Sequence, residues 1–315
     1  MNINRGVQKI DSWQQRHRSI AFIYAVIKKY GEDNGGYQAA LLTYYGFLSL
    51  FPLLLVVVTV LQLWFRGDPT VQQEVSTSVG HFFPLLGQQL QRQIHGLRSA
   101  GVGLAVGLLI TAYGARGAAD AFRFALDNMW QVPRHKRAGF PKNIVRSLAI
   151  LAAGLAGFAA TAAVSAFTAA LGHSVWTKVL ANVLGFFILT FVLGYAYRIA
   201  TSGRIRYRFM LLGAGIAAFI MQLLLSFGGL LLSHELQRLD GVYGTFAVVL
   251  GLFFWMYLLA QVVIYAAEID TVRHFGLWPR SLSGRLRTEA DKHAYKLYAQ
   301  SEKYIEKETI SVSFK

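Results

Sequence analysis

Residues 39–65 read AALLTYYGFLSLFPLLLVVVTVLQLWF, an unbroken run without a formally charged side chain. At about 1.5 Å per residue, a helix of this length crosses the roughly 30 Å hydrocarbon core of a bilayer. The run therefore predicts a transmembrane helix. Pro52 lies near its middle and has no N–H to donate to the carbonyl of Leu48, so a helix kink is expected at Pro52.

Five further apolar stretches follow, and the composition agrees with them. Of the 315 residues, 54% are hydrophobic and 15% are charged, against roughly 25% charged in soluble domains. We therefore predict an all-α polytopic membrane protein with six transmembrane helices in a domain of residues 39–270. The predicted spans cover about 39–65, 99–115, 147–171, 176–197, 209–233 and 241–267.

The distribution of positive charge predicts the orientation. With both termini in the cytoplasm, all but five of the 31 Lys and Arg residues fall in cytoplasmic segments, as the positive-inside rule requires. This topology explains the net charge of +15, so no nucleic-acid partner is expected. The five exceptions lie in predicted outer loops: Arg66, Arg92, Arg98, Lys178 and Arg238.

We make separate predictions for three segments outside the spans. Residues 1–38 form a cytoplasmic amphipathic segment, whose helix either lies among anionic headgroups or packs under the bundle. Residues 66–99 form either a surface cap or a re-entrant element. Residues 271–315 form a polar cytoplasmic tail, in which 285–307 can be helical. The amphipathic pattern repeats at three- and four-residue steps in Ile10, Trp13, His17, Ile20, Tyr24 and Ile27.

Charged residues continue beyond the second span without a helix-breaking signal. They alternate in sign at steps of four, three and four on one helical face, as Arg116, Asp120, Arg123 and Asp127. This face is either a solvated side of a protruding helix or the polar lining at the mouth of a cavity. If Arg123 is buried against Asp120 or Asp127, its loss costs about 3–5 kcal/mol. If the face is solvated, the cost is about 0–1 kcal/mol.

The residue types offer no catalytic set. The chain has no cysteine, which excludes disulfides, thiolate metal sites and cysteine nucleophiles. The eight histidines are scattered over both predicted sides without metal-ligand spacing. Glu268 and Asp270 lie two residues apart on one helix and therefore point in different directions. We expect no enzymatic activity, no metal and no cofactor.

Three stretches carry a resemblance to a known family. They are AALLTYYGFLSLFPLLL at 39–55, ALDNMWQVP at 125–133 and YGTFAVVLGLFFWMYLLAQVVIYAAEID at 243–270. Together they resemble the YihY / virulence-factor BrkB family of bacterial inner-membrane proteins, over about residues 25–275. The resemblance implies a six-span, multi-pass protein of the inner (cytoplasmic) membrane. Where relatives commonly end the third stretch with Asn, this chain has Asp270.

The resemblance leaves the activity open. Members have carried the label ribonuclease BN, and others have been connected with serum resistance or with export of lipid-type envelope precursors. Phosphodiester cleavage needs clustered carboxylates for metals or a His/Lys acid–base arrangement. The sequence shows no such set, so ribonuclease activity is not expected.

Two functions remain. The first is a transporter or flippase-like exporter of an anionic lipid or lipid-linked envelope precursor, in which arginines attract the headgroup. The second is a non-catalytic membrane scaffold or envelope-assembly factor that contacts anionic lipid and an envelope protein partner. The Gly-rich helix faces suit contacts within one chain or within a homo-oligomer. The substrate-binding residues predicted for the exporter are Tyr44, Tyr45, Arg116, Asp120, Arg123, Asp127, Asn128 and Glu268.

Overall fold

The computed structural model describes residues 3–64, 101–170, 174–203, 205–243, 245–282 and 288–314. Within these ranges the regular structure is helical and includes no strand, which confirms the all-α prediction. The α-helices are α1 (Ile3–Arg16), α2 (Arg18–Glu32), α3 (Gly35–Trp64), α6 (Gly101–Met129), α7 (Lys142–Ala170), α8 (Val175–Ala200), α9 (Leu211–Tyr243), α10 (Thr245–Phe275) and α11 (Glu289–Ser301). Two short 3₁₀ turns are η2 (Arg134–Lys136) and η3 (Tyr207–Phe209).

Long apolar helices dominate the described ranges. Three stretches are long and apolar enough to cross a membrane: Lys142–Thr161 in α7, Val175–Ala200, and Val249–Phe275 in α10. Their outward side chains include exposed aromatics such as Phe187 and Phe191 of α8. Large exposed apolar surfaces of this kind mark contact with a membrane. The helices therefore agree with a polytopic membrane protein.

Each predicted span but the last corresponds to one helix, and several helices run past the predicted bounds. The predicted boundary between the last two spans is displaced, because α9 continues through the predicted loop 234–240 to Tyr243 and α10 begins at Thr245. α3 includes residues 39–64 and stays helical through the backbone of Pro52, where the kink remains a prediction. α6 continues past residue 115 to Met129, as the missing helix-breaking signal led us to expect. α10 likewise continues to Phe275. The loop 66–99, with its two alternative structures, lies outside the described residues.

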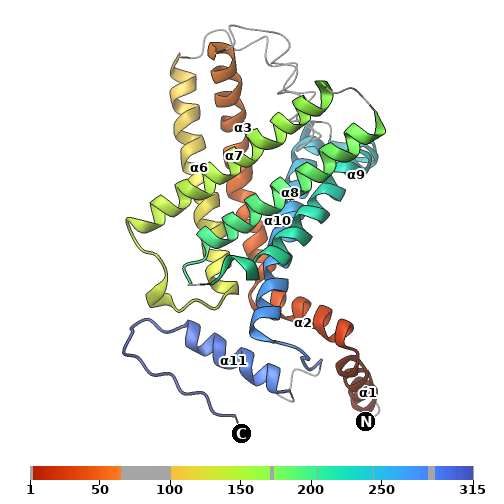
Figure 1. Ribbon diagram of the computed structural model, residues 1–315, viewed down its shortest axis with the longest axis vertical. Coiled ribbons are helices and arrows are strands. Elements are labelled where there is room, and N and C mark those ends of the chain that lie inside the picture. Colours follow the sequence, from red (N-terminus) through yellow and green to blue (C-terminus); the bar gives the residue numbers. More distant parts are fainter. Residues whose placement is uncertain are drawn as a thin grey trace.

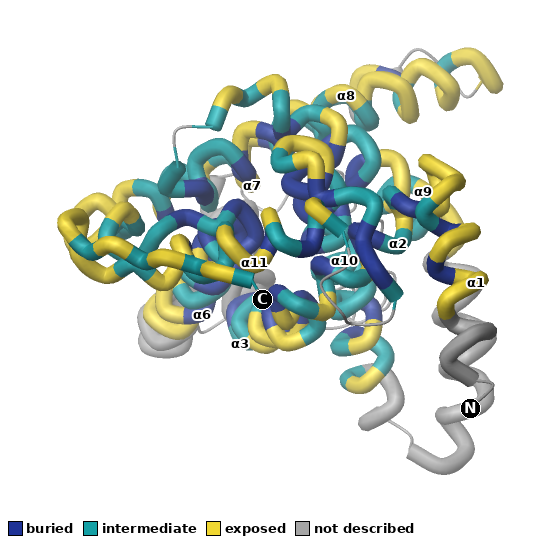
Figure 2. The backbone as a smooth tube through the Cα atoms, turned by 90° about the horizontal axis from the view of Figure 1, so that it is seen from below, coloured by how far each residue is buried: buried dark blue, intermediate teal, exposed yellow. Residues whose placement is uncertain are grey.

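The helices meet in a core near the lower end of the bundle in Figure 1. α3 packs against α6 and α10, α9 packs against α8 and α10, and α7 packs against α8. The ends of α6 and α8, the start of α9 and the second half of α10 bury a shared apolar cluster. Figure 2 shows buried segments gathered at the centre of this end of the molecule. The cluster includes Leu126, Met129, Tyr197, Met210 and Ile264.

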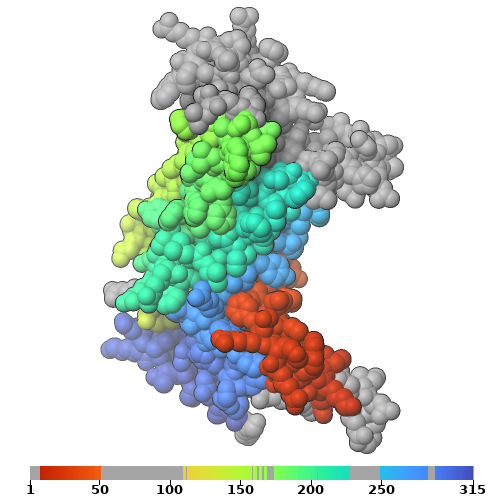
Figure 3. Space-filling model, turned by 45° about the vertical axis from the view of Figure 1, so that its right-hand side comes forward, coloured from red at the N-terminus to blue at the C-terminus, as the bar shows by residue number. Residues whose placement is uncertain are grey.

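Both chain ends form a layer against this end of the bundle (Figures 1 and 3). The predicted amphipathic segment is divided into α1 and α2. α2 packs Ala25 and Val26 against Val272, Leu277 and Ala294, so one of its faces lies under the bundle. The predicted tail is part of the same layer, because Ala294 belongs to α11. Headgroup contact remains a prediction for the opposite, exposed face of α2, which carries Ile20, Ile23 and Ile27.

Gly213 allows α9 and α10 to touch, and Gly213→Ala tests that contact. A Cβ at this position would clash with the backbone carbonyl of Ala266 and with the carboxylate of Asp270. Because the backbone cannot move aside without separating the helices, we expect a loss of about 1–3 kcal/mol, measured as a lower Tm in detergent. Gly154→Ala is the matched control, since no atom lies within 4 Å of a Cβ there. An equal Tm for both variants would contradict close packing at Gly213.

Candidate functional site

A pocket of about 510 Å³ opens between α3 and α6. The two helices come close there because Gly117 has no side chain and the ring of Tyr45 occupies that space. Tyr44 lies beside the pocket, with its ring 5.2 Å from that of Tyr45. The pocket combines apolar, aromatic and charged side chains, so it suits an amphipathic ligand. Its lining includes Leu41, Tyr45, Tyr113, Arg116, Asp120 and Phe124.

The charged side chains at the pocket and behind it become less exposed from Arg116 to Arg123 along α6. Arg116 has 57% of its side chain exposed, and its Nε lies 3.6 Å from Oδ2 of Asp120. Arg123 is only 7% exposed, and its Nη1 lies 3.1 Å from Oδ1 of Asp120. The hydroxyl of Ser147 also donates to Asp120, over 2.8 Å. Asp120 is therefore held from the buried side, and Arg116 is the cation that faces outward.

Arg123 of α6 contacts both the first turns of α7 and the segment before α7. Its guanidinium donates to the carbonyls of Asn143 and Ala138 over 3.2 and 3.4 Å. Within the charged face, Arg116 is exposed and lines the pocket, whereas Arg123 is buried against Asp120. The higher of the two stability costs does not follow for Arg123, because Asp120 is 39% exposed and keeps Arg116 and Ser147 as partners when Arg123 is removed.

Asp127 and Asn128 serve the end of α6 and not the pocket. The carboxylate of Asp127 accepts from the backbone N–H of Ser202 over 2.6 Å and from its hydroxyl over 2.9 Å. The carbonyl of Asn128 accepts from the backbone and side-chain amides of Gln131, whose φ of 48° belongs to the turn that ends the helix. Asp127 accepts from Ser202, and the ion pair of Arg123 is with Asp120 and not with Asp127 at the i,i+4 position.

Glu268 lies in a separate buried cluster with Lys29 and Asp33, called the Lys29 cluster below. Lys29 Nζ donates to the Asp33 carboxylate and, over 2.9 Å, to the carbonyl of Met129, and it lies 3.0 Å from Oε2 of Glu268. Burial lowers the pKa of Lys29, but the carboxyl groups, Asp33 foremost, more than reverse this and leave the pKa above the usual lysine value. Sequence reasoning missed Lys29, for which the only signal was Asp33 four residues later.

The acids of α10 separate as their spacing predicted. Glu268 faces Lys29 of α2, whereas the carboxylate of Asp270 accepts from the backbone N–H of Gly213 in α9 over 2.8 Å. Another polar pair joins α9 to α8, because Gln222 Nε2 donates to the carbonyl of Asn182 over 2.7 Å. These contacts leave the pocket with Tyr45, Arg116 and Asp120 of the predicted site residues in its wall.

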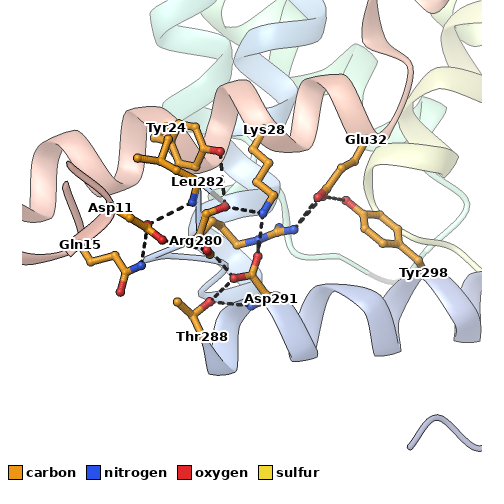
Figure 4. A network of polar contacts seen from close by, with 11 residues as sticks. Asp11, Gln15, Tyr24, Lys28, Glu32, Arg280, Leu282, Thr288, Asp291 and Tyr298 are labelled. Carbon is orange, nitrogen blue, oxygen red and sulfur yellow. Dashed lines mark hydrogen bonds and ion pairs between the residues drawn. The ribbon is translucent and has the colours of Figure 1, made fainter. Parts of the chain in front are cut away.

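A second set of charges missed by sequence reasoning joins the tail to α2 (Figure 4). Arg280 is fully buried, and its guanidinium donates to both carboxylate oxygens of Glu32 over 2.7 and 2.8 Å and to Asp291 over 2.6 Å. Lys28 Nζ donates to the same Asp291 over 2.9 Å. We call these four residues the Arg280 network. Tyr298 of α11 adds a hydrogen bond from its hydroxyl to Glu32 over 2.8 Å.

Acid should weaken the Arg280 network through Asp291. Burial raises the pKa of this carboxyl, but hydrogen bonds from Thr288, Arg280 and the backbone of Ser281 outweigh burial and leave the pKa below its usual value. A carboxyl with a lower pKa in the folded state stabilises that state above its unfolded-state pKa and loses this effect as the pH falls through the folded-state pKa.

We therefore expect Asp291→Asn to have a lower Tm than wild type at neutral pH, with the difference shrinking below about pH 4. The measurement is a series of thermal unfolding curves of both proteins in detergent across that pH range. A Tm difference that stays constant down to acid pH would show that Asp291 does not act as a carboxylate.

These features define a class of protein. The chain is a helical, multi-pass membrane protein with a charged pocket between two long helices. In the described ranges no group of three or more His, Cys, Asp or Glu side chains is arranged to hold a metal ion. The chain belongs to the virulence factor BrkB family, whose sequence model matches residues 26–277.

The relatives agree with that assignment. A UPF0761 membrane protein of Vibrio vulnificus (strain YJ016) is 24% identical over 277 residues, covering 85% of this chain and 87% of the relative. A UPF0761 membrane protein of Pseudoalteromonas atlantica (strain T6c / ATCC BAA-1087) is 25% identical over 264 residues, covering 80% and 85%. No solved structure matches the chain significantly. The relatives and the apolar helices support a bacterial membrane location.

Proposed function

We propose that this protein is an exporter of an anionic lipid or lipid-linked envelope precursor in the bacterial inner membrane, acting as a transporter or flippase and not as an enzyme. The observation that carries the proposal is the pocket between α3 and α6. It places Arg116, an exposed cation, beside Leu41 and Phe124, which are 41% and 49% exposed apolar side chains. A phosphate or carboxylate headgroup with an attached hydrocarbon chain presents the matching chemistry.

In this proposal each residue of the pocket has a part in binding. Arg116 donates charge-assisted hydrogen bonds to the headgroup, because its guanidinium faces outward. Asp120 sets the position of Arg116, and Arg123 with Ser147 holds Asp120 from the buried side. Tyr45 and Tyr113 supply amphipathic rings at the pocket wall.

Arg116→Ala is the direct test. Hydrogen bonds to charged groups contribute about 1.5–3 kcal/mol, so the variant should translocate an anionic reporter lipid roughly 10–100-fold more slowly in proteoliposomes. Because Arg116 is largely exposed, the variant should keep the Tm of wild type. Arg134→Ala is the control, since that arginine is also exposed but pairs with Glu302 away from the pocket.

The outcomes separate the two functions. Wild-type translocation that Arg116→Ala leaves unchanged would remove the pocket from the pathway. Wild-type rates equal to those of empty liposomes for every lipid would favour the second function, a non-catalytic scaffold or envelope-assembly factor. The observation that suits a scaffold is the outer surface of the docked tail, where Tyr295 is 41% exposed and Ile305 is 67% exposed.

A further inference from the structure

The Lys29 cluster contains one more acid than base. The side chains of Lys29, Asp33 and Glu268 are 0%, 3% and 0% exposed. If both acids were ionised, the three side chains would bury a net negative charge. An uncompensated buried charge is costly, and a protein relieves it by keeping one group neutral. The question is which of the two acids carries the proton.

Hydrogen bonding distinguishes the two acids. Both carboxylate oxygens of Asp33 have donors, because Lys29 reaches Oδ2 and the side-chain amide of Gln131 reaches Oδ1 over 3.1 Å. Glu268 differs, since its Oε1 is buried and has no hydrogen-bond partner among the described residues. A bare anionic oxygen costs more than a bare neutral carbonyl oxygen. The surroundings therefore suit an ionised Asp33 and a neutral Glu268.

Thr271 offers an acceptor for that proton. Its Oγ1 lies 3.0 Å from the backbone carbonyl of Glu268 and also 3.0 Å from Oε2 of the same residue. A hydroxyl has one proton to donate. When Thr271 donates to the backbone carbonyl, a lone pair of Oγ1 is free to accept from a protonated Oε2. Lys29 has no further N–H for Oε1, because its three donors point to Asp33, Met129 and Oε2.

We propose that Glu268 is a proton-binding site that holds one exchangeable proton on Oε2 and releases it to water when the Lys29 cluster opens. After release, the Glu268 carboxylate competes with Asp33 for Lys29. The polar and charged groups that surround the site are Lys29, Tyr30 and Glu32 of α2, Asp33 after it, the Met129 carbonyl of α6, Thr271 of α10 and Tyr298 of α11.

α6 links this site to the pocket. The helix carries Arg116 and Asp120 at the pocket and presents the Met129 carbonyl to Lys29 at its end. When Glu268 loses its proton, the contacts of Lys29 change, and one of these contacts is with α6, the helix that lines the pocket. In this role, which rests on the proposed function, the proton bound by Glu268 is the ion that drives export.

Infrared spectroscopy tests the proton without any transport assay. The full-length protein in lipid nanodiscs at neutral pH should show the C=O stretch of a protonated carboxyl, and Glu268→Gln should lose one such band. Asp270→Asn is the matched control, because Asp270 is a buried acid of the same helix that contacts Gly213 and not Lys29. Spectra of Glu268→Gln that retain every protonated-carboxyl band would overturn the proposal.

Thermal unfolding of the same variant provides a second test. Glutamine has the shape of a neutral glutamic acid, so Glu268→Gln should fold with the Tm of wild type. A Tm far below that of wild type would overturn the proposal, because it would show that the ionised form, paired with Lys29, is the one that stabilises the fold.

A pH gradient across proteoliposomes tests the coupling. Wild-type lipid translocation should speed up or slow down with the direction of the gradient, whereas Glu268→Gln should translocate at one rate in both directions. A wild-type rate that ignores the gradient would overturn the coupling. Wild-type protein that translocates nothing would count against the proposed function, and the infrared result would then decide the proton site by itself.

Discussion

Arg280→Ala will destabilise the protein by about 3–5 kcal/mol. The change removes the cation that faces Glu32 and Asp291, whose side chains are only 20% and 1% exposed. Lys28 can still compensate Asp291, but among the described residues Glu32 keeps no cation and accepts from the hydroxyl of Tyr298 alone. The expected result in detergent is a much lower Tm and faster proteolysis of the layer formed by α1, α2 and α11.

Two further variants make the Arg280 result interpretable. Arg280→Lys should recover only part of the loss, because the guanidinium uses two separate nitrogens, Nε toward Asp291 and Nη2 toward Glu32, whereas lysine has a single ammonium. Lys292→Ala should have the Tm of wild type, since its ion pair with Glu289 lies on the surface. A wild-type Tm for Arg280→Ala would mean that water replaces the guanidinium without cost and that the network does not hold the tail.

Lys29→Met will have a comparable effect, about 3–5 kcal/mol. Methionine replaces most of the apolar stem but removes the ammonium, so the buried Asp33 carboxylate loses its one cationic partner among the described residues and keeps neutral donors such as Gln131. The carbonyl of Met129 also loses its contact with Lys29. Thermal unfolding in detergent and in nanodiscs measures the loss.

Double variants show which acid bears the charge. With a neutral Glu268, Lys29→Met/Asp33→Asn should be more stable than Lys29→Met, because no uncompensated charge remains. Lys29→Met/Glu268→Gln should be no more stable than the single variant, because Glu268 carries no charge to remove. The opposite order would place the charge on Glu268 and the proton on Asp33.

Local spacing explains what the sequence could predict of the site. The pairs of Asp120 with Arg116 and Arg123 follow from steps of four and three residues on one helix, and the structure contains both pairs. The continuation of α6 to Met129 was predictable in the same way, because nothing between the charges breaks a helix. Such inferences need only the geometry of a single helix.

Contacts between residues far apart in the sequence cannot be predicted from the geometry of a single helix. The burial of Arg123 depends on Asn143 and Ser147, 20 and 24 residues away, and Lys29 meets Glu268 from another helix. Neither contact produces a periodic pattern of residue types in the sequence. Lys29 and Arg280 lie in polar, basic segments, where a charged side chain is expected to be solvated. Burial reverses that expectation only once tertiary packing is known.

The Arg280 network also sets an order of events during synthesis. Glu32 and Arg280 are 248 residues apart, and at roughly 5–20 residues per second the ribosome needs roughly 12–50 s to pass from one to the other. For that time the apolar face of α2 has no α11 to cover it. The newly made N-terminal segment therefore stays accessible to chaperones, and α2 packs against α11 only after α11 has left the ribosome. A prematurely ended chain remains recognisable by its uncovered α2.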